Sequence, residues 1–406
     1  MRPLDGIRVI GLEQYMAGPY CTLLLADAGA EVIKIERPGS GDPRRAMPPF
    51  AEKDGNKKAT GFMAYNRNKK SLALNLHDDA GKEVFKRLCA TSDVVVENLR
   101  PGSMNKQGLG FEAMSKLNQR LIWGVISGFG QLPGHTGPYA DRPAFDIVAE
   151  AMSGIMNMVG FADKPPSWTI YGMADIYSGQ VTAYGIMQAL FMRERTGKGQ
   201  FVDSSMFDNM IALNEAQMAL YSVAGQVNSR GKPKNVWPRD AYECKDGWIA
   251  VNVPDNIIWG RMAETIGHPE LKDDPRSNSG PARCQNAEFL QPLLAAWFAT
   301  QTRDSAADAL NGAGVPCGPV YDTADVFADP QVQARGVLVD IDDPTVGSFK
   351  FARTPPHLSA APEIPTRPAP ALGQHTREIM EGLLGYSTTE IEDLAAKGVV
   401  GLAASG

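Results

Sequence analysis

The sequence predicts an α/β protein with a parallel sheet and a second, smaller α+β domain. The chain opens with a short buried strand, a helix and another buried strand, the order of a right-handed β-α-β crossover. The alternation then continues, with strands expected at 7–12, 31–36, 71–75, 94–97, 121–127 and 199–203. A polar, proline-bearing stretch at 225–239 interrupts the pattern and indicates a linker, after which new strands and helices begin.

The composition is that of an ordinary globular protein and excludes several classes of function. A length of 406 residues predicts two or three domains, and the net charge of −6 argues against nucleic acid or an anionic membrane as the main partner. No apolar run approaches the roughly 20 residues that span a bilayer, so we expect a cytoplasmic protein. The five cysteines form no CxxC pair and the five histidines show no metal-ligand spacing, so no metal site is predicted.

The loop after the first strand, EQYMAGP at 13–19, lacks the GxGxxG pattern of a dinucleotide-binding fold. Glu36 occupies the place of a ribose-binding acid, but Arg37 follows at once, which disfavours a nicotinamide enzyme. Arg37, Arg44 and Arg45 follow the second strand, at the edge where open α/β sheets bind ligands, and are well placed to meet phosphates. A solvated basic loop is the alternative.

A carboxylate, Asp175, lies at the start of a long apolar helix that ends near Gly197. The apolar residues cover more than one face of this helix, so we expect it to be buried: Ile176, Tyr177, Val181, Tyr184, Ile186, Met187, Leu190 and Phe191. As an N-cap, Asp175 would accept amide hydrogens of the first turn. As a nucleophile, it would be aimed and kept ionised by the helix end. The segment alone leaves both interpretations open.

The remaining motifs are glycine-rich or proline-rich. After the strand at 121–127, the loop GFGQLPGHTGPYADRP has a backbone that can approach a ligand closely. Residues 355–370, rich in Pro and Ala, are expected to run extended over a surface, and two short helices follow at 376–384 and 388–397. Cys317, with no histidine near it in sequence, is interpreted as a structural loop cysteine.

Several long motifs together resemble the class III coenzyme A transferases of the CaiB/BaiF type, such as formyl-CoA transferase and L-carnitine CoA-transferase. They include LDGIRV, AGPYCTLLLADAGAEVIKIERPGSGD, NRNKKSLALNL, VENLRPG, ADIYSGQ, RERTGKGQFVD, GVPCGPV and LGQHT. The resemblance implies a Rossmann-like large domain built from both termini and a homodimer whose two chains interlock. We expect the large, CoA-binding domain at 1–200 completed by 355–406, a linker at 201–235, the small domain at 236–325, and a return linker at 326–354.

The resemblance also implies which residues act. The aspartate of the A-D-x-x-x-G segment is the nucleophile of this family, which corresponds to Asp175 with Gly179 here. Coenzyme A, as a substrate and not a permanently bound cofactor, would be bound by Arg37, Leu72, Asn98, Arg100, Lys106 and Arg142. The substrate pocket and the donors to the oxyanion are expected among Gln14, Tyr15, Met16, Gly128, Gly130, Gln131 and Tyr139.

The expected reaction moves CoA from an acyl-CoA donor to a carboxylic acid acceptor. Asp175 would attack the thioester carbonyl to give a mixed anhydride and free CoA thiolate, and the thiolate would then form an aspartyl-CoA thioester. The acceptor acid would reverse these steps. Backbone amides of residues 128–131 would hold each oxyanion.

Two departures from the family and two alternatives bear on this expectation. Met16 stands where formyl-CoA transferases have Gln, and 225–239 lacks their run of glycines, which disfavours oxalate and formate as substrates. The related α-methylacyl-CoA racemases use a His-Asp pair, but Phe145 and Asp146 stand there, so the base for α-proton abstraction is missing. A CoA-binding protein without turnover is the other alternative, and the presence of both Asp175 and Gly179 argues against it.

Overall fold

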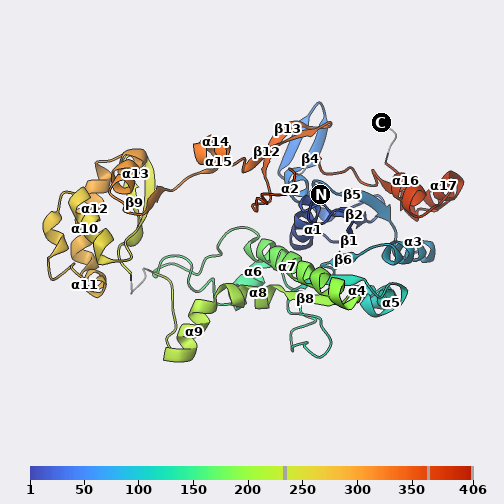
Figure 1. The fold of residues 1–406 in the computed structure, drawn as a ribbon, viewed down its shortest axis with the longest axis horizontal. Helices are drawn as coiled ribbons and strands as arrows, with labels where there is room; N and C mark the ends of the chain where they lie inside the picture. Colours follow the sequence, from blue (N-terminus) through green and yellow to red (C-terminus); the bar gives the residue numbers. More distant parts are fainter. Residues whose placement is uncertain (232–235, 364–365, 404–406) are drawn as a thin grey trace. The chain divides into compact units, whose positions relative to one another are not determined.

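The chain divides into two compact units, each described by itself. The larger unit contains residues 1–159, 166–228 and 336–406, and the smaller unit contains 160–165 and 229–335. The structure is a computed structural model that describes residues 1–231, 236–363 and 366–403 (Figure 1). Residues 232–235 of the expected linker and 364–365 and 404–406 of the expected C-terminal segment lie outside these ranges.

A seven-stranded sheet organises the larger unit, in the order β14-β5-β2-β1-β6-β7-β8. The strands are β1 (Arg8–Leu12), β2 (Glu31–Glu36), β5 (Lys70–Leu74), β6 (Val94–Glu97), β7 (Ile122–Ser127), β8 (Phe201–Ser205) and β14 (Val400–Gly401). All neighbours pair in parallel except β14, which is antiparallel to β5. Counted along the chain, the parallel strands have the order 3-2-1-4-5-6 of a doubly wound fold. Because that order reverses between β1 and β6, a crevice is expected at the carboxyl ends of these two strands.

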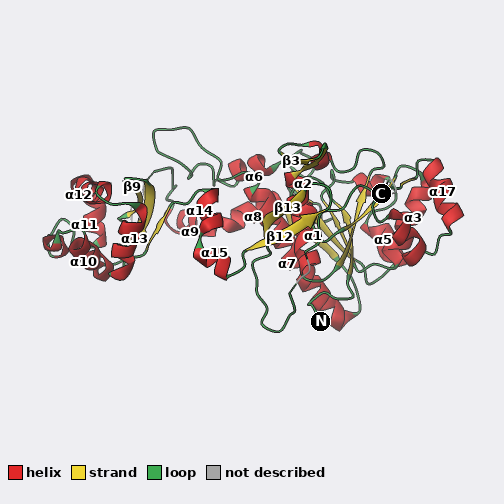
Figure 2. Cartoon of the chain, turned by 90° about the horizontal axis from the view of Figure 1, so that it is seen from above, coloured by secondary structure: helices red, strands yellow, loops and turns green. Residues whose placement is uncertain are grey.

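Helices cover both faces of this sheet (Figure 2). One face carries α1 (Ala17–Asp27), α6 (Asp146–Met152), α7 (Met173–Thr196) and α8 (Met206–Leu213). The other carries α3 (Asp79–Ala90), α4 (Ser103–Lys106), α5 (Phe111–Leu117), the π-helical turn Ile379–Leu383 and α17 (Thr388–Ala396). The strands alternate between the two cores: in β7, Trp123 and Val125 enter one, and Ile122 and Ile126 enter the other. This burial on both faces explains the apolar runs that predicted the strands.

Smaller elements complete the larger unit. They are α2 (Thr60–Asn66), α9 (Glu215–Ala224), α16 (Thr376–Glu378), the 3₁₀ turn Pro43–Ala46, and two hairpins made of β3 (Phe50–Lys53) with β4 (Asn56–Ala59) and β12 (Leu338–Asp343) with β13 (Gly347–Ala352). Two expected linkers therefore contain structure of the larger unit. The segment 201–235 includes β8, α8 and α9, and the segment 326–354 includes the second hairpin.

The smaller unit has an antiparallel sheet and its own core. The sheet has the order β11-β10-β9, and helices pack beside it. Its elements are β9 (Arg239–Cys244), β10 (Gly247–Asn252), α10 (Asn256–Thr265), the 3₁₀ turn Pro269–Lys272, α11 (Gly280–Gln285), α12 (Ala287–Ala299), α13 (Arg303–Gly312), β11 (Cys317–Pro319), α14 (Thr323–Ala328) and α15 (Pro330–Ala334). Tyr242 stacks on Phe298 in this core, with ring centroids 4.6 Å apart.

The long helix α7 corrects one expectation. Its buried residues are mostly small, and Gly179 packs so closely on α1 that an added Cβ would lie 2.6 Å from the carbonyl oxygen of Ala17. The opposite face is apolar but exposed in the single chain: Tyr184 is 65% exposed and Phe191 60%. The prediction that α7 is buried on all faces was wrong for the isolated chain. Only one apolar face of the helix packs against the sheet and α1, and the other is exposed.

Candidate active site

Asp175 is not the cap of α7. The N-cap position is held by Gly172, in the left-handed conformation, and Asp175 is the third residue of the helix. The cap comes from another element: Oδ1 of Asp146, the first residue of α6, accepts the amides of Ala174 at 2.6 Å and Asp175 at 3.2 Å. Within the described residues, the carboxylate of Asp175 forms no hydrogen bond. The capping interpretation was therefore wrong, and this carboxylate is available for chemistry.

The surroundings of Asp175 oppose its ionisation. Burial and, to a smaller extent, the like charge of Asp146 raise the pKa of Asp175 to about 7, although the Arg44 guanidinium acts in the other direction. The helix end was expected to keep Asp175 ionised, but loss of hydration outweighs that effect. A carboxylate with a pKa near neutrality is more basic than an exposed one and still substantially ionised at neutral pH, which suits a nucleophile.

Arg44, in the 3₁₀ turn Pro43–Ala46, is the basic group that acts on Asp175. Its side chain is buried, and Nη1 donates a hydrogen bond of 3.1 Å to the hydroxyl of Tyr171. Gly61 makes room for it, because a Cβ there would lie 2.3 Å from Nη2. The adjacent Arg45 is a structural residue: it binds Glu36 at 2.7 Å and the carbonyl oxygen of Pro370. Of the three arginines expected to meet phosphates, Arg45 is thus already paired within the protein.

The loop after β1 lies against the first turn of α7. Met16 is buried, and a Cβ on Gly172 would lie 2.2 Å from its Cε atom. Tyr15 has a φ of +64°, an unusual conformation for a residue with a side chain, and its ring packs edge-on against Phe145 at 6.3 Å. The structure therefore brings the expected substrate residues Tyr15 and Met16 close to the start of the helix that carries Asp175.

Asn98 connects the loops that follow β1 and β6, the two strands at which the crevice is expected. Its side-chain amide donates to the carbonyl oxygen of Gln14 and its side-chain oxygen accepts the amide of Gln14, both at 2.9 Å. These bonds connect the loop after β6 to the loop after β1. Asn98 was expected to bind CoA, but its side chain is engaged in fixing the position of Gln14.

A buried ionic cluster beneath this loop was missed by the sequence reasoning. Glu13 binds Lys34 at 3.1 Å and Lys69 at 3.0 Å, and Lys34 also binds Asp42 at 2.9 Å. The two lysines hold the pKa of Glu13 at about 2 against the effect of burial, whereas burial lowers the pKa of Lys69 to about 8. A lysine inside the otherwise apolar strand EVIKIE was the available signal, since such a charge requires a partner. The cluster fixes the start of the loop that reaches α7.

The other expected CoA residues divide into two groups. Arg37, Arg100, Lys106 and Arg142 are exposed, and Arg142 stacks on the ring of Tyr139 at 3.8 Å. The side chain of Leu72 is buried in the core at β5, so any contact of this residue with CoA would have to come from its backbone.

Two amides of the glycine loop after β7, which were expected to hold an oxyanion, have acceptors within the chain. The amide of Gly130 donates to the hydroxyl of Ser127 at 2.9 Å, and the amide of Gln131 donates to the carboxylate of Asp203 at 2.9 Å. These two amides therefore already have acceptors and are not available to an oxyanion. Gly128 meets Ala144 closely, since a Cβ there would lie 2.4 Å from the Cβ of Ala144.

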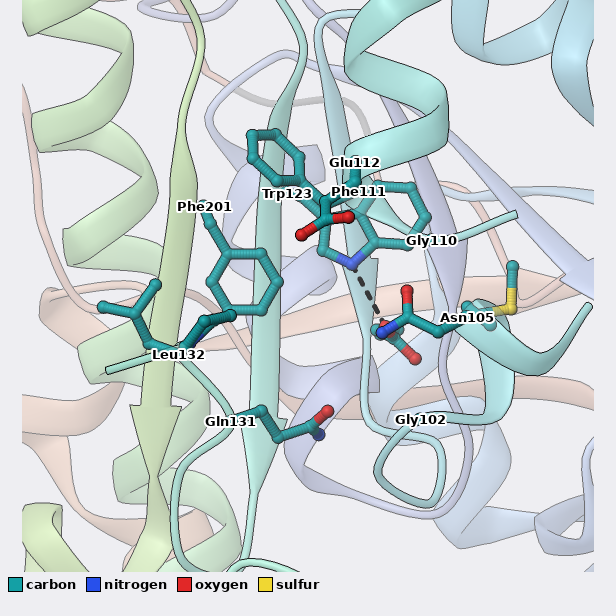
Figure 3. A pocket seen from close by; sticks show the side chains of 12 residues that line it. Gly102, Asn105, Gly110, Phe111, Glu112, Trp123, Gln131, Leu132 and Phe201 are labelled. Atoms are coloured by element: carbon teal, nitrogen blue, oxygen red, sulfur yellow. Dashed lines mark hydrogen bonds between the residues drawn. The ribbon is translucent and has the colours of Figure 1, made fainter. Parts of the chain in front are cut away.

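A pocket of about 310 Å³ lies beside the loops that follow β6 and β7 (Figure 3). It is lined by Glu97, Gly102, Met104, Asn105, Gly110, Phe111, Glu112, Trp123, Gln131, Leu132, Pro133 and Phe201. The indole of Trp123 donates to Glu97 at 3.0 Å, and burial raises the pKa of Glu97 to about 7. Trp123 faces the core opposite to α7, so this pocket does not contain Asp175. It lies next to the basic loop that contains Arg100 and Lys106.

None of the helices within the described residues is long and apolar enough to cross a membrane. Comparisons with known proteins identify relatives of the same family and fold. Residues 4–376 match the sequence model of "CoA-transferase family III". A crystal structure of a CAIB/BAIF family protein from Brucella suis has a TM-score of 0.85 and 36% identity, and the match covers 94% of this chain and 99% of that one.

Curated relatives are similar in sequence to this protein along nearly the whole chain. Succinyl-CoA–D-citramalate CoA-transferase of Chloroflexus aurantiacus is 38% identical over 402 residues, which is 98% of each chain. Succinyl-CoA:glutarate CoA-transferase of Mus musculus is 36% identical over 404 residues, which is 98% of this chain and 91% of that one. The doubly wound fold, the carboxylate without a hydrogen bond at the start of α7 and these matches lead to one conclusion. The chain belongs to CoA-transferase family III and is a CoA-transferase.

Proposed function

We propose that Asp175 is the nucleophile that carries CoA from an acyl-CoA to a free carboxylic acid. The observation that supports this most directly is the carboxylate of Asp175 at the start of α7: Asp146 caps the helix, and Asp175 itself is left without a hydrogen-bond partner among the described residues. A carboxylate that the fold largely removes from water and leaves without a hydrogen-bond partner is a candidate for function rather than for stability.

The proposed steps form and break one bond at a time. An oxygen of Asp175 bonds to the thioester carbon, the carbon–sulfur bond breaks, and a mixed anhydride and CoA thiolate result. The thiolate then attacks the carbonyl carbon of Asp175, which releases the donor acid and leaves an aspartyl-CoA thioester. The acceptor carboxylate attacks that carbonyl and expels the thiolate again. Finally the thiolate takes the new acyl group and frees Asp175.

For CoA itself we propose the exposed basic residues Arg37, Arg100, Lys106 and Arg142 as the phosphate-binding set. Arg37, Arg100 and Lys106 follow the carboxyl ends of β2 and β6, on the edge where ligands collect in doubly wound sheets. Arg37→Ala and Arg100→Ala should each raise the KM for acyl-CoA more than they lower kcat, because a phosphate contact persists throughout the reaction. An unchanged KM in both variants would remove them from the site.

The decisive test concerns Asp175. Asp175→Ser should stay folded, because Asp146 and not Asp175 caps the helix, and it should lose transfer by several orders of magnitude. Wild-type protein incubated with acyl-CoA alone should accumulate an adduct that hydroxylamine or borohydride traps, and mass spectrometry should locate it on the peptide with Asp175. An active serine variant, or an adduct on Cys317, would overturn the mechanism.

We further propose that two copies form an interlocked homodimer. The exposed apolar face of α7, which contains Tyr184, Met187, Phe191 and Met192, supports a second chain there, since monomers rarely leave such a continuous surface in water. Light scattering should give twice the mass of one chain. Phe191→Glu should weaken the assembly, whereas Glu194→Gln, on the same helix but at an exposed charged position, should not. A stable monomer at micromolar concentration would contradict the proposal.

A further inference from the structure

Arg44 is a buried cation with no acidic partner among the described residues. The side chain is 8% exposed, and within the described residues it forms no salt bridge, while its Nε–H has no hydrogen-bond acceptor. Two other buried arginines have an acidic partner: Arg67 binds Asp27 at 2.8 Å and Arg193 binds Asp93 at 3.0 Å. The buried Arg283 has no acid beside it among the described residues, but it donates three hydrogen bonds to neutral oxygens, whereas Arg44 donates only one from its side chain. A guanidinium removed from water without a counter-ion is costly, so its retention calls for a ligand that supplies the missing charge.

The position of this cation ties it to the reacting carboxylate. The hydroxyl of Tyr171 accepts the hydrogen bond that Arg44 donates. Tyr171 lies just before the N-cap residue of α7, the helix that contains Asp175 in its first turn. Arg44 acts electrostatically on Asp175, although the two form no ion pair within the part of the chain that the structure describes. The charges of both groups act on the hydroxyl of Tyr65, which places all three side chains in one neighbourhood. A positive group thus stands a short distance from the proposed nucleophile.

We propose that Arg44 binds the second carboxylate of a dicarboxylic acyl group and so selects dicarboxylic over monocarboxylic acids. The proposal rests on the assignment of Asp175 as nucleophile. When the near carboxyl carbon lies at Asp175, the far carboxylate of a short dicarboxylic acid would reach the unpaired donors of Arg44. The planar guanidinium can donate two parallel hydrogen bonds, and Tyr171 would hold it in orientation.

The names of the relatives are consistent with this substrate class. Succinyl-CoA is the named donor for the Chloroflexus aurantiacus and Mus musculus enzymes, and D-citramalate and glutarate are the named acceptors. Each of these acids carries two carboxylates, one of which stays free when the other is bound to CoA. A neutral pocket would not distinguish such a group from a methyl group strongly, whereas a buried cation would.

The test compares two thioesters that differ only at the far end, succinyl-CoA and butyryl-CoA. The measured quantity is the ratio of their kcat/KM values in the formation of the Asp175 adduct. Arg44→Met, which keeps the length but removes the charge, should lower this ratio by about 10- to 100-fold, the range expected for a charge-assisted hydrogen bond. Arg44→Lys should keep part of the preference. Arg37→Met is the matched control, because a CoA contact affects both thioesters equally.

A second measurement compares the binding of two free acids to the wild-type protein. It needs no reaction and does not depend on whether the Arg44→Met variant folds. Succinate should bind the resting wild-type protein at least about tenfold more tightly than butyrate in calorimetry, and Tyr171→Phe, which frees the guanidinium, should reduce the difference. An unchanged thioester ratio in Arg44→Met, or equal binding of the two acids to wild type, would overturn the proposal. Failure of the nucleophile assignment would be visible separately, as an Asp175→Ser variant that transfers CoA from either thioester.

Discussion

Replacing Asp175 by Asn should make the protein more stable while it abolishes transfer. The pKa of Asp175 is raised from 3.8 to about 7, chiefly by burial and then by Asp146, so the folded protein binds a proton that the unfolded chain has lost. Wild-type stability therefore falls as the pH rises from 3.8 to about 7, and the whole penalty is present above pH 7. Asn carries no charge at any pH and escapes this penalty.

The size of the gain follows from the shift. A difference of about 3 pKa units corresponds to about 4 kcal/mol, and the partial exposure of the side chain reduces the expected gain to about 2 to 3 kcal/mol. Thermal unfolding at pH 8 should show a rise in Tm of several degrees for Asp175→Asn and little change at pH 4. Asp141→Asn, on an exposed loop, changes the net charge equally and serves as the control. A lower Tm at pH 8, or a gain of the same size at pH 4, would refute the reasoning.

Four further predictions concern the ionisation of Asp175 and the packing of the elements around it. Adduct formation from acyl-CoA should rise with pH as Asp175 ionises, about 100-fold between pH 5 and the plateau, with a midpoint near 7. Asp146→Asn keeps an oxygen for the cap but removes a like charge, so the midpoint should move to lower pH; no movement, or movement upward, would contradict this. Gly179→Ala should lower stability by about 1 to 3 kcal/mol in urea unfolding, because its Cβ would lie 2.6 Å from the carbonyl oxygen of Ala17, and an unaffected variant would show that α1 and α7 are not in such close contact. Glu13→Gln leaves two buried lysines with one charge fewer and should cost about 3 to 5 kcal/mol in the same assay, a loss that an ordinary surface substitution would not approach.

The sequence predicted the architecture of the larger unit well, because its signals are local. The strands expected at 7–12, 94–97 and 121–127 are found within one residue, and Gly197 ends α7 in the left-handed conformation. The apolar runs reflect burial on both sheet faces, and a glycine after a helix reflects a backbone requirement of that residue alone.

The errors arose where a residue's role depends on a distant partner. The sequence shows that Gln131 follows a strand, but not that Asp203, 72 residues later, accepts its amide. The sequence likewise predicts Asp175 at the start of a helix. It does not reveal that Asp146, which lies 29 residues before Asp175 in the chain, accepts the amide hydrogens of that helix. The unpaired state of Arg44 has no local signature either, because only the folded chain shows which basic residues have acids beside them. Such pairings are set by topology, which periodicity does not encode.

The antiparallel strand β14 has a consequence for how this chain is made. It pairs Val400 with Leu74 on the outer edge of β5, more than three hundred residues after that edge was synthesised. Until residue 400 leaves the ribosome, β5 presents an open row of amide and carbonyl groups, the kind of edge on which other chains aggregate. The smaller unit, continuous from 229 to 335 apart from a short contribution of 160–165, can complete its core earlier. In a chain that ends before residue 400, the smaller unit could therefore be folded while the edge of β5 is still unpaired. Chaperones and proteases would recognise that exposed edge.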